Sequence, residues 1–133
     1  MDQQAFDLTK TYVHLGRSSR AIPLPDFEWT EDYLTRYEAD TADDGGDGRL
    51  VMISTSRASW TSWERHPAGE ELVALLSGGA TLVQEVDGEE RRTDLESGQA
   101  IINPTGVWHT ADVHELSQFL FITPGRGTEH RPR

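Results

Sequence analysis

The sequence predicts an all-β domain, a sandwich or a barrel, that follows an irregular N-terminal extension. Three observations support this prediction. The chain has 133 residues, which is the usual length of a single domain. From Leu50 onward, about eight short segments rich in apolar and β-branched residues follow one another at a spacing of roughly 8–12 residues. Glycine and proline turns separate these segments, with almost no helical periodicity between them.

The predicted organisation has three parts. Residues 1–48 form the extension, which packs on the barrel or on a partner subunit, residues 49–124 form the barrel, and residues 125–133 form a polar tail. Pro23 and Pro25 forbid a continuous helix through the extension. The extension is therefore expected to be mostly irregular.

A short helix is predicted within the extension. Trp29, Tyr33 and Tyr37 recur at every fourth position, which places them on one face of a helix that begins near Thr30. The hydroxyl group of Thr30 could cap such a helix. Aromatic residues also suit a strand, so the pattern leaves that alternative open.

An acidic, glycine-rich stretch covers residues 38–48. Its aspartates are Asp40, Asp43, Asp44 and Asp47, and they do not have the spacing of a calcium-binding EF-hand loop. The stretch is therefore predicted to be a solvated loop. It would account for much of the net charge of −11.

The predicted strands are residues 50–56, 61–66, 71–76, 81–86, 89–95, 100–102, 107–113 and 117–122. Asp87 and Gly88 form a strong hairpin signal between two of them. Several strands are apolar at successive positions, so both of their faces are expected to be buried. One face would fill the barrel, and the N-terminal segment or a second subunit would cover the other. A homodimer is the expectation.

Charge and composition exclude several classes of function. The chain has 23 acidic and 12 basic side chains, a balance that disfavours nucleic acid and anionic membranes as partners. It has no cysteine, which excludes disulfides, thiolate zinc sites and cysteine nucleophiles. The sequence shows no signal-like leader and no long apolar segment, so a cytoplasmic protein is expected.

Histidine and carboxylate side chains gather around two predicted turns. Glu64 and His66 are two residues apart, so in a strand their side chains leave the same face. Glu71 opens the next strand after a tight turn, which can bring it back beside His66. His109 follows a second turn, in which a proline and a glycine precede it. Two imidazoles with one or two carboxylates are the ligand types of a first-row divalent metal ion.

These residues resemble the two sequence motifs of the cupins. The first motif is carried by His66, Glu71 and Gly78, and the second by Gly98, Pro104, Gly106 and His109. The intervals between the residues fit the spacing of the family, and the predicted hairpin lies between the two motifs. The resemblance covers about residues 50–123. The chain therefore looks like a small single-domain cupin.

The resemblance implies a double-stranded β-helix, a jelly-roll barrel with a metal ion held inside it. The implied ligands are Glu64, His66, Glu71 and His109, and the implied ion is Mn, Fe, Zn or Ni. Glu64 stands where the family pattern has its first histidine, and the opening glycine and the closing asparagine of the motifs are missing. Two carboxylates in one cavity disfavour joint ionisation, and a divalent cation would remove that conflict.

The resemblance also implies a metal-dependent enzyme, dioxygenase- or isomerase-like, that acts on a small organic molecule. Glu64 could leave the ion and act as a general base. The alternative is a non-catalytic domain that senses a small ligand or a metal, and a storage or structural role is a third hypothesis. His14, His114 and His130 lie outside both motifs and are not expected to be ligands.

Overall fold

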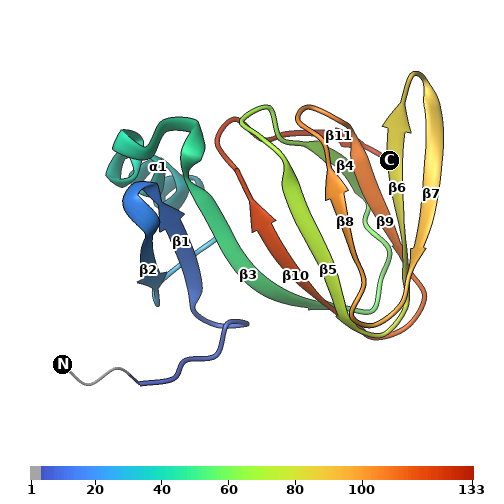
Figure 1. The fold of residues 1–133 in the computed structure, drawn as a ribbon, viewed down its shortest axis with the longest axis horizontal. Coiled ribbons are helices and arrows are strands. Elements are labelled where there is room, and N and C mark those ends of the chain that lie inside the picture. Colours follow the sequence, from blue (N-terminus) through green and yellow to red (C-terminus); the bar gives the residue numbers. More distant parts are fainter. Residues whose placement is uncertain (1–3) are drawn as a thin grey trace.

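The computed structural model describes residues 4–133, which form two antiparallel β-sheets that face each other (Figure 1). The six-stranded sheet has the order β2 (Arg20–Leu24), β1 (Tyr12–Gly16), β3 (Arg49–Ser56), β10 (Ser117–Thr123), β5 (Glu71–Ser77), β8 (Ala100–Asn103). The five-stranded sheet has the order β11 (Glu129–Pro132), β4 (Ser62–Arg65), β9 (His109–Val113), β6 (Ala80–Val86), β7 (Glu89–Leu95). The helices are α1 (Glu31–Asp40) and two 3-10 helices, η1 (Arg17–Ser19) and η2 (Ala42–Asp47).

From β3 onward the chain passes back and forth between the two sheets, except at the hairpin of β6 and β7, and this confirms the predicted double-stranded β-helix. Strand β3 pairs with β10 and strand β4 pairs with β9, so segments far apart in the sequence lie side by side. Every predicted strand is present, with ends that differ by two residues or fewer. At the predicted hairpin, Asp87 and Gly88 both have a positive φ, of 54° and 77°. This is the backbone that a two-residue hairpin turn requires.

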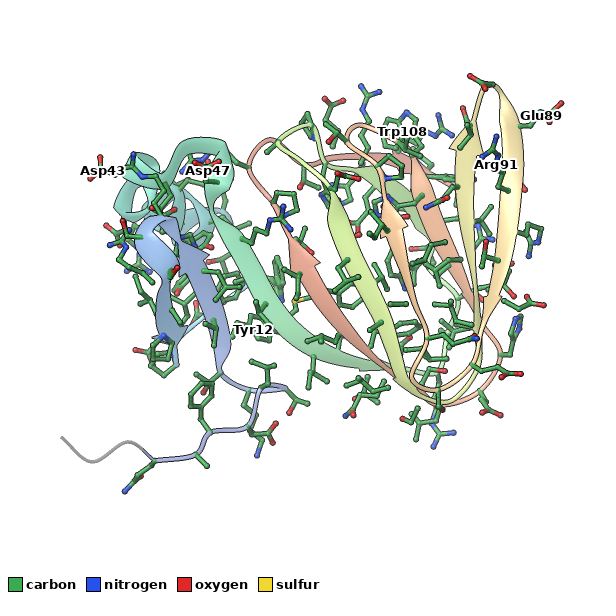
Figure 2. All side chains as sticks on the ribbon, viewed as in Figure 1. Tyr12, Asp43, Asp47, Glu89, Arg91 and Trp108 are labelled. Atoms are coloured by element: carbon green, nitrogen blue, oxygen red, sulfur yellow. The ribbon has the colours of Figure 1, made fainter. Side chains whose placement is uncertain are left out.

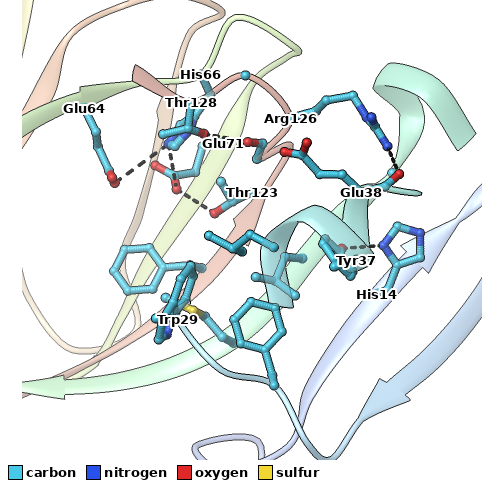
Figure 3. Close-up of a pocket in the computed structure, with 18 of the residues that line it drawn as sticks. His14, Trp29, Tyr37, Glu38, Glu64, His66, Glu71, Thr123, Arg126 and Thr128 are labelled. Carbon is cyan, nitrogen blue, oxygen red and sulfur yellow. Dashed lines mark hydrogen bonds and ion pairs between the residues drawn. The ribbon is translucent and has the colours of Figure 1, made fainter. Parts of the chain in front are cut away.

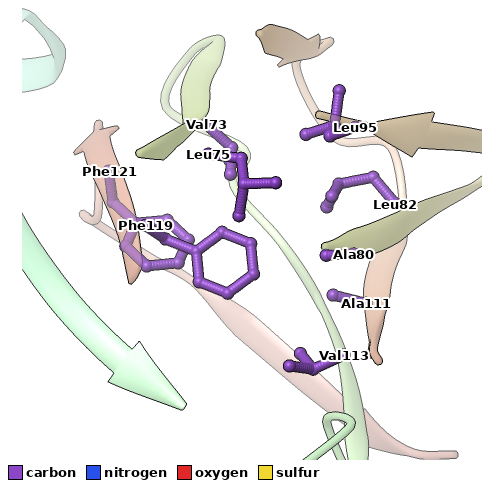
Figure 4. Close-up of a cluster of buried hydrophobic side chains, with 9 residues drawn as sticks. All are labelled: Val73, Leu75, Ala80, Leu82, Leu95, Ala111, Val113, Phe119 and Phe121. Carbon is purple, nitrogen blue, oxygen red and sulfur yellow. The ribbon is translucent and has the colours of Figure 1, made fainter. Parts of the chain in front are cut away.

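The hydrophobic core lies between the sheets (Figure 4). Its buried members are Val73, Leu75, Ala80, Leu82, Leu95, Ala111, Val113, Phe119 and Phe121. Because successive side chains of a strand point to opposite faces, the inward row of β5 is Glu71, Val73 and Leu75. The inward row therefore begins with the carboxylate of Glu71, and its next two members, Val73 and Leu75, belong to the hydrophobic core.

The expectation of an irregular extension is wrong for residues 12–24. Strands β1 and β2 form a hairpin that extends the six-stranded sheet, with Val13 opposite Val51 of β3. Pro23 lies in β2, at the edge of the sheet, where a missing backbone N–H disturbs no inner ladder. The predicted helix is confirmed as α1, and the Oγ1 atom of Thr30 accepts a hydrogen bond from the backbone N of Tyr33 at 3.1 Å.

The predicted solvated loop is wrong for Asp44, whose residue surface is only 2% exposed. Its carboxylate accepts hydrogen bonds from the Nε2 atom of His14 at 2.7 Å, the backbone N of Arg17 at 3.0 Å and the guanidinium of Arg20 at 3.0 Å. Asp43 lies at the outer end of the molecule in Figure 2 and is exposed. The carboxylate of Asp44 therefore ties β1 and η1 to η2.

The C-terminal segment contains a strand that the sequence did not predict, because residues 129–132 form β11, which pairs with β4. The guanidinium carbons of Arg65 and Arg131 each lie 4.6 Å from the ring of Trp108, and Trp108 sits at the rim in Figure 2. The cation–π contact of Arg131 holds β11 in place at the edge of the five-stranded sheet. No helix in residues 4–133 has the length and apolar character needed to cross a membrane.

The outward face of the six-stranded sheet keeps part of its apolar surface exposed. Ile102 is 55% exposed and Leu76 is 38% exposed. The extension continues the sheet at its edge, so it leaves this face of β5 and β8 uncovered. The homodimer stays a prediction.

The hydrogen bond from His14 and the backbone N–H of Arg17 hold the pKa of Asp44 well below its ordinary value. A carboxylate with a lowered pKa stabilises the fold fully above its unfolded pKa of about 4, and this stabilisation is lost as the pH falls below it. We expect Asp44→Asn to lower the free energy of unfolding at pH 7. The gap to wild type should narrow progressively as the pH falls below about 4. Urea titrations followed by tryptophan fluorescence measure it.

The matched control is Asp43→Asn, which removes an exposed carboxylate from the same stretch. This variant is expected to unfold like the wild type at pH 7. If the two variants lose the same stability at pH 7, the carboxylate of Asp44 is not the anchor of the extension.

Candidate metal centre

Four side chains from the two facing sheets meet at one end of the barrel. In the five-stranded sheet, Glu64 of β4 stands directly opposite His109 of β9, and His66 follows the end of β4. In the six-stranded sheet, Glu71 opens β5 and faces inward. One ligand atom from each of the four residues lies within 4.8 Å of the others. The structure thus brings together all four residues that the sequence singled out.

The carboxylate of Glu71 lies between the two imidazoles. Its Oε1 atom is 3.1 Å from the Nε2 atom of His109, and its Oε2 atom is 3.2 Å from the Nε2 atom of His66. The Oε1 atom of Glu64 is 3.5 Å from the Nε2 atom of His109 and 3.8 Å from that of His66. Two carboxylates and two ring nitrogens therefore surround one point.

Burial and charge act against each other in this cluster. Burial by itself would raise the pKa of Glu71, but the facing His109 and His66 outweigh it and hold the pKa well below its usual range. Burial by itself would lower the pKa of His109, but the facing Glu64 and Glu71 raise it to about 9. The carboxylate of Glu71 therefore stays ionised and attracts a positive charge.

Hydrogen bonds at the far side of each imidazole leave the Nε2 atoms free to act as ligands. The Nδ1 atom of His109 lies 3.1 Å from the backbone O of Val107, which can only accept, so Nδ1 carries the proton. The Nδ1 atom of His66 lies 2.8 Å from the hydroxyl oxygen of Thr128. That hydroxyl donates its own hydrogen to the backbone O of Gly125 at 2.8 Å, so it accepts from His66. Because a metal ligand must be a neutral ring, a bound cation would replace the proton that the raised pKa of His109 otherwise keeps at Nε2, and both Nε2 lone pairs would then point at the cation.

A second set of hydrogen bonds orients Glu71. Asn103 stands opposite Glu71 on β8, and its Nδ2 atom donates to Oε1 of Glu71 at 3.0 Å. The hydroxyl of Thr123 donates to Oε2 at 2.6 Å. Gln84 donates to the Oδ1 atom of Asn103 at 2.8 Å, and this contact fixes the orientation of the Asn103 amide. The carboxylate is therefore held in position before anything binds.

The cluster fits a divalent cation. The Nε2 atoms of His66 and His109 are buried and have no hydrogen-bond partner, and they are the only such side-chain atoms in the part of the chain that the structure describes. Buried polar atoms without a partner are costly, and a metal ion would satisfy both. Imidazole nitrogens and carboxylate oxygens suit Mn, Fe, Zn or Ni. Glu64 is the most exposed of the four side chains, at 23%.

A cavity of about 580 Å³ leads from this cluster toward the N-terminal extension (Figure 3). Glu64, His66 and Glu71 form one part of its wall. Residues from β3 and β10 form another part, and the loop before α1 and α1 itself contribute further lining residues. The volume is in the range of small-molecule binding sites.

The remaining histidines lie outside the cluster of four. His14 is buried against Asp44, and the exposed His114 lies 2.8 Å from the hydroxyl of Thr81. The Nε2 atom of His130 lies 3.3 Å from Oε2 of Glu64, with its side chain 59% exposed. Sequence reasoning treated His130 as part of a polar tail because its pairing with Glu64 across β11 and β4 has no local signal.

Comparison with known proteins finds a similarity of fold to solved structures. No protein-family model and no curated protein matches it. A conserved protein of unknown function with a double-stranded β-helix domain, from Klebsiella pneumoniae, is 22% identical, with a TM-score of 0.53 over 64% of this chain and 76% of that one. Hydroxypropylphosphonic acid epoxidase from S. wedmorenis is 11% identical, with a TM-score of 0.50 over 56% of this chain and 43% of that one.

A cupin-2 domain containing protein from Shewanella frigidimarina is 18% identical, with a TM-score of 0.48 over 64% of this chain and 71% of that one. At these identities the likeness concerns the fold. The chain has the fold of a double-stranded β-helix domain, which is the fold that the resemblance of its two motifs implied. It carries at the mouth of the barrel a His/Glu cluster that could hold a metal ion.

The turn before His109 depends on one glycine. Gly106 has a φ of +73°, and a Cβ atom added there would meet no neighbour within 4 Å. Its backbone N donates to the backbone O of His66 at 3.0 Å, which joins the two motif turns. We expect Gly106→Ala to lower the free energy of unfolding by about 1–2 kcal/mol through backbone strain alone. Urea denaturation measures the loss.

Gly125 is the matched control, because a Cβ there also meets nothing within 4 Å and its φ is not positive. Gly125→Ala is expected to leave the free energy of unfolding nearly unchanged. Equal losses in the two variants would show that the left-handed backbone of Gly106 is not the cause.

Proposed function

We propose that this domain binds one divalent metal ion through Glu64, His66, Glu71 and His109 and acts as a metal-dependent enzyme on a small organic molecule. One observation carries the proposal: two buried Nε2 atoms without partners face two carboxylates, and three of these four residues, Glu64, His66 and Glu71, line a cavity. Two carboxylates and two neutral imidazoles balance the charge of a divalent ion. A structural ion would need no cavity beside it.

The bound ion would supply Lewis acidity and open coordination positions to a ligand in the cavity. His66, His109 and Glu71 are the fixed ligands, since hydrogen bonds to Thr128 and Val107 orient the two imidazoles and hydrogen bonds from Asn103 and Thr123 orient the carboxylate. Such outer hydrogen bonds set the direction of each ligand and raise its basicity. We propose dioxygenase- or isomerase-like chemistry at an ion held in this way.

Glu64 has a different environment, which favours a role in proton transfer. Its Oε1 atom faces His109, and its Oε2 atom faces His130 at 3.3 Å. No Asn or Thr side chain holds it as Asn103 and Thr123 hold Glu71, and it is more exposed than the other three. Glu64 can accept a proton from a bound molecule and pass it to the exposed imidazole of His130.

Removal of either imidazole tests the metal site. We expect His66→Ala and His109→Ala to lose most of the bound metal, because each change removes a buried ligand that no neighbour replaces. Elemental analysis of untagged protein, expressed with Mn, Fe, Zn and Ni supplied, measures the content. His114→Ala is the control and should keep the wild-type amount, since His114 lies outside the cluster. Stoichiometric metal in both cluster variants would refute the assignment.

The same analysis on Glu64→Gln separates the roles of the two carboxylates. Three ligands remain in this variant, so it is expected to retain the ion with a weaker affinity. An affinity equal to that of the wild type would show that Glu64 is not a ligand.

The hydroxyl of Thr128 is expected to control metal affinity without touching the ion. Thr128→Val removes the acceptor that fixes the Nδ1 proton of His66, and such changes typically weaken metal binding about 10- to 100-fold. Competition with a chelator of known affinity measures the change. Thr128→Ser keeps the hydroxyl and should restore wild-type affinity. Thr93→Val, on an exposed position of β7, is the control, and a loss of affinity in it equal to that of Thr128→Val would contradict the proposal.

A further inference from the structure

The N-terminal extension builds one wall of the cavity, and that wall is aromatic. The loop between β2 and α1 contributes Phe27 and Trp29, and α1 contributes Leu34 and Tyr37. The ring centroids of Phe27 and Trp29 lie 4.8 Å apart with an angle of 70° between the rings. This edge-to-face arrangement is a favourable geometry for aromatic pairs, so the loop has a defined shape.

Trp29 is unusual because it lines the cavity while its surface is 60% exposed. Tyr12 and Phe27 hold its ring, with centroid distances of 6.1 Å and 4.8 Å. A large aromatic side chain that is kept in place but not covered offers apolar area to a ligand.

The barrel supplies the opposite apolar wall. Trp60, Phe121 and Met52 line the cavity from this side. The ring of Trp60 lies 6.0 Å from that of Phe121 and 6.3 Å from that of His109. Aromatic surface therefore reaches from the loop of the extension to the rings of the His/Glu cluster.

One cation lies at this cavity without a carboxylate partner. Arg126 lines the cavity, and its guanidinium donates to the backbone O of Glu38 at 2.9 Å. It makes no ion pair with a carboxylate in residues 4–133, although most other arginines near the barrel do. In Figure 3, Arg126 and the cluster lie along the upper side of the pocket and Trp29 along the lower side. The pocket is thus amphipathic.

We propose that the cavity selects an aromatic carboxylate of one or two rings. The ring packs between the loop of Phe27 and Trp29 and the barrel wall of Trp60, and the carboxylate of the ligand faces the guanidinium of Arg126. This inference names the ligand class of the proposed function and rests on it for the reaction. The selection itself comes from the extension and Arg126, which belong to neither motif.

The binding of three simple probes measures the contribution of the aromatic ring and that of the carboxylate to affinity separately. Isothermal titration calorimetry of the full chain with benzoate, acetate and benzyl alcohol compares a ring with a carboxylate, the carboxylate alone and a neutral ring. We expect benzoate to bind about 10-fold or more tightly than acetate, because only benzoate buries a ring. Benzoate that binds no better than acetate overturns the proposal.

Variants of Trp29 and Arg126 test whether Trp29 contacts the aromatic ring of the ligand and whether Arg126 contacts its carboxylate. Trp29→Ala should weaken benzoate about 3- to 10-fold and leave acetate unchanged, and Trp29→Phe should restore most of the loss. Arg126→Gln should weaken benzoate and leave benzyl alcohol unchanged, and Arg126→Lys should restore part of it. Leu116→Ala is the control, since Leu116 is an apolar residue with 48% exposure that does not line the cavity. Variants of Trp29 and Arg126 that behave like this control overturn the proposal.

The metal content of each variant keeps this inference distinct from the proposed function. Trp29→Ala and Arg126→Gln should retain the wild-type metal content, because neither residue belongs to the cluster. If the protein holds metal but does not prefer benzoate, only the ligand class is wrong. If it prefers benzoate but holds no metal, the proposed enzyme is wrong and the aromatic pocket stands.

Discussion

Two carboxylates lie close together inside this barrel, and the arrangement of the site follows from the need to compensate their charge. Glu71 is 1% exposed, and Glu64 faces the same two imidazoles. Like charges that are shielded from water raise each other's energy unless positive charge lies between them. The site provides that charge through imidazole rings, whose outer nitrogens are fixed by a hydroxyl and a backbone carbonyl. A divalent cation between the two carboxylates would compensate both of their negative charges.

The sequence predicted the barrel and the four clustered residues because both depend on local signals. Turns such as Asp87 and Gly88 mark strand ends, and the spacing of His66 and His109 resembles the two cupin motifs, which implies that they share one site. The parts that sequence reasoning missed depend on partners far along the chain. Asp44 looks like one of several solvated aspartates until β1 brings His14 beside it, 30 residues away in sequence. Register between distant strands has no signature in one sequence.

The extension has a larger role than its composition suggested. The buried carboxylate of Asp44 ties β1, η1 and η2 to one another, and this arrangement sets where α1 and the loop of Phe27 and Trp29 lie. Tyr37 of α1 joins the same network, since its hydroxyl lies 2.6 Å from the Nδ1 atom of His14. The shape of the cavity therefore depends on a hydrogen-bond network that contains none of the clustered residues.

The hydroxyl of Thr128 orients His66 across 62 residues of sequence, and β11, which begins at the next residue, pairs with the strand that carries Glu64. During translation, His66 and Glu71 leave the ribosome long before Thr128 has been synthesised. A nascent chain can therefore present single imidazoles and carboxylates to passing ions but cannot present the oriented set. Any ion that the site selects is chosen by the folded barrel after synthesis, from the ions free in the surrounding solution at that time.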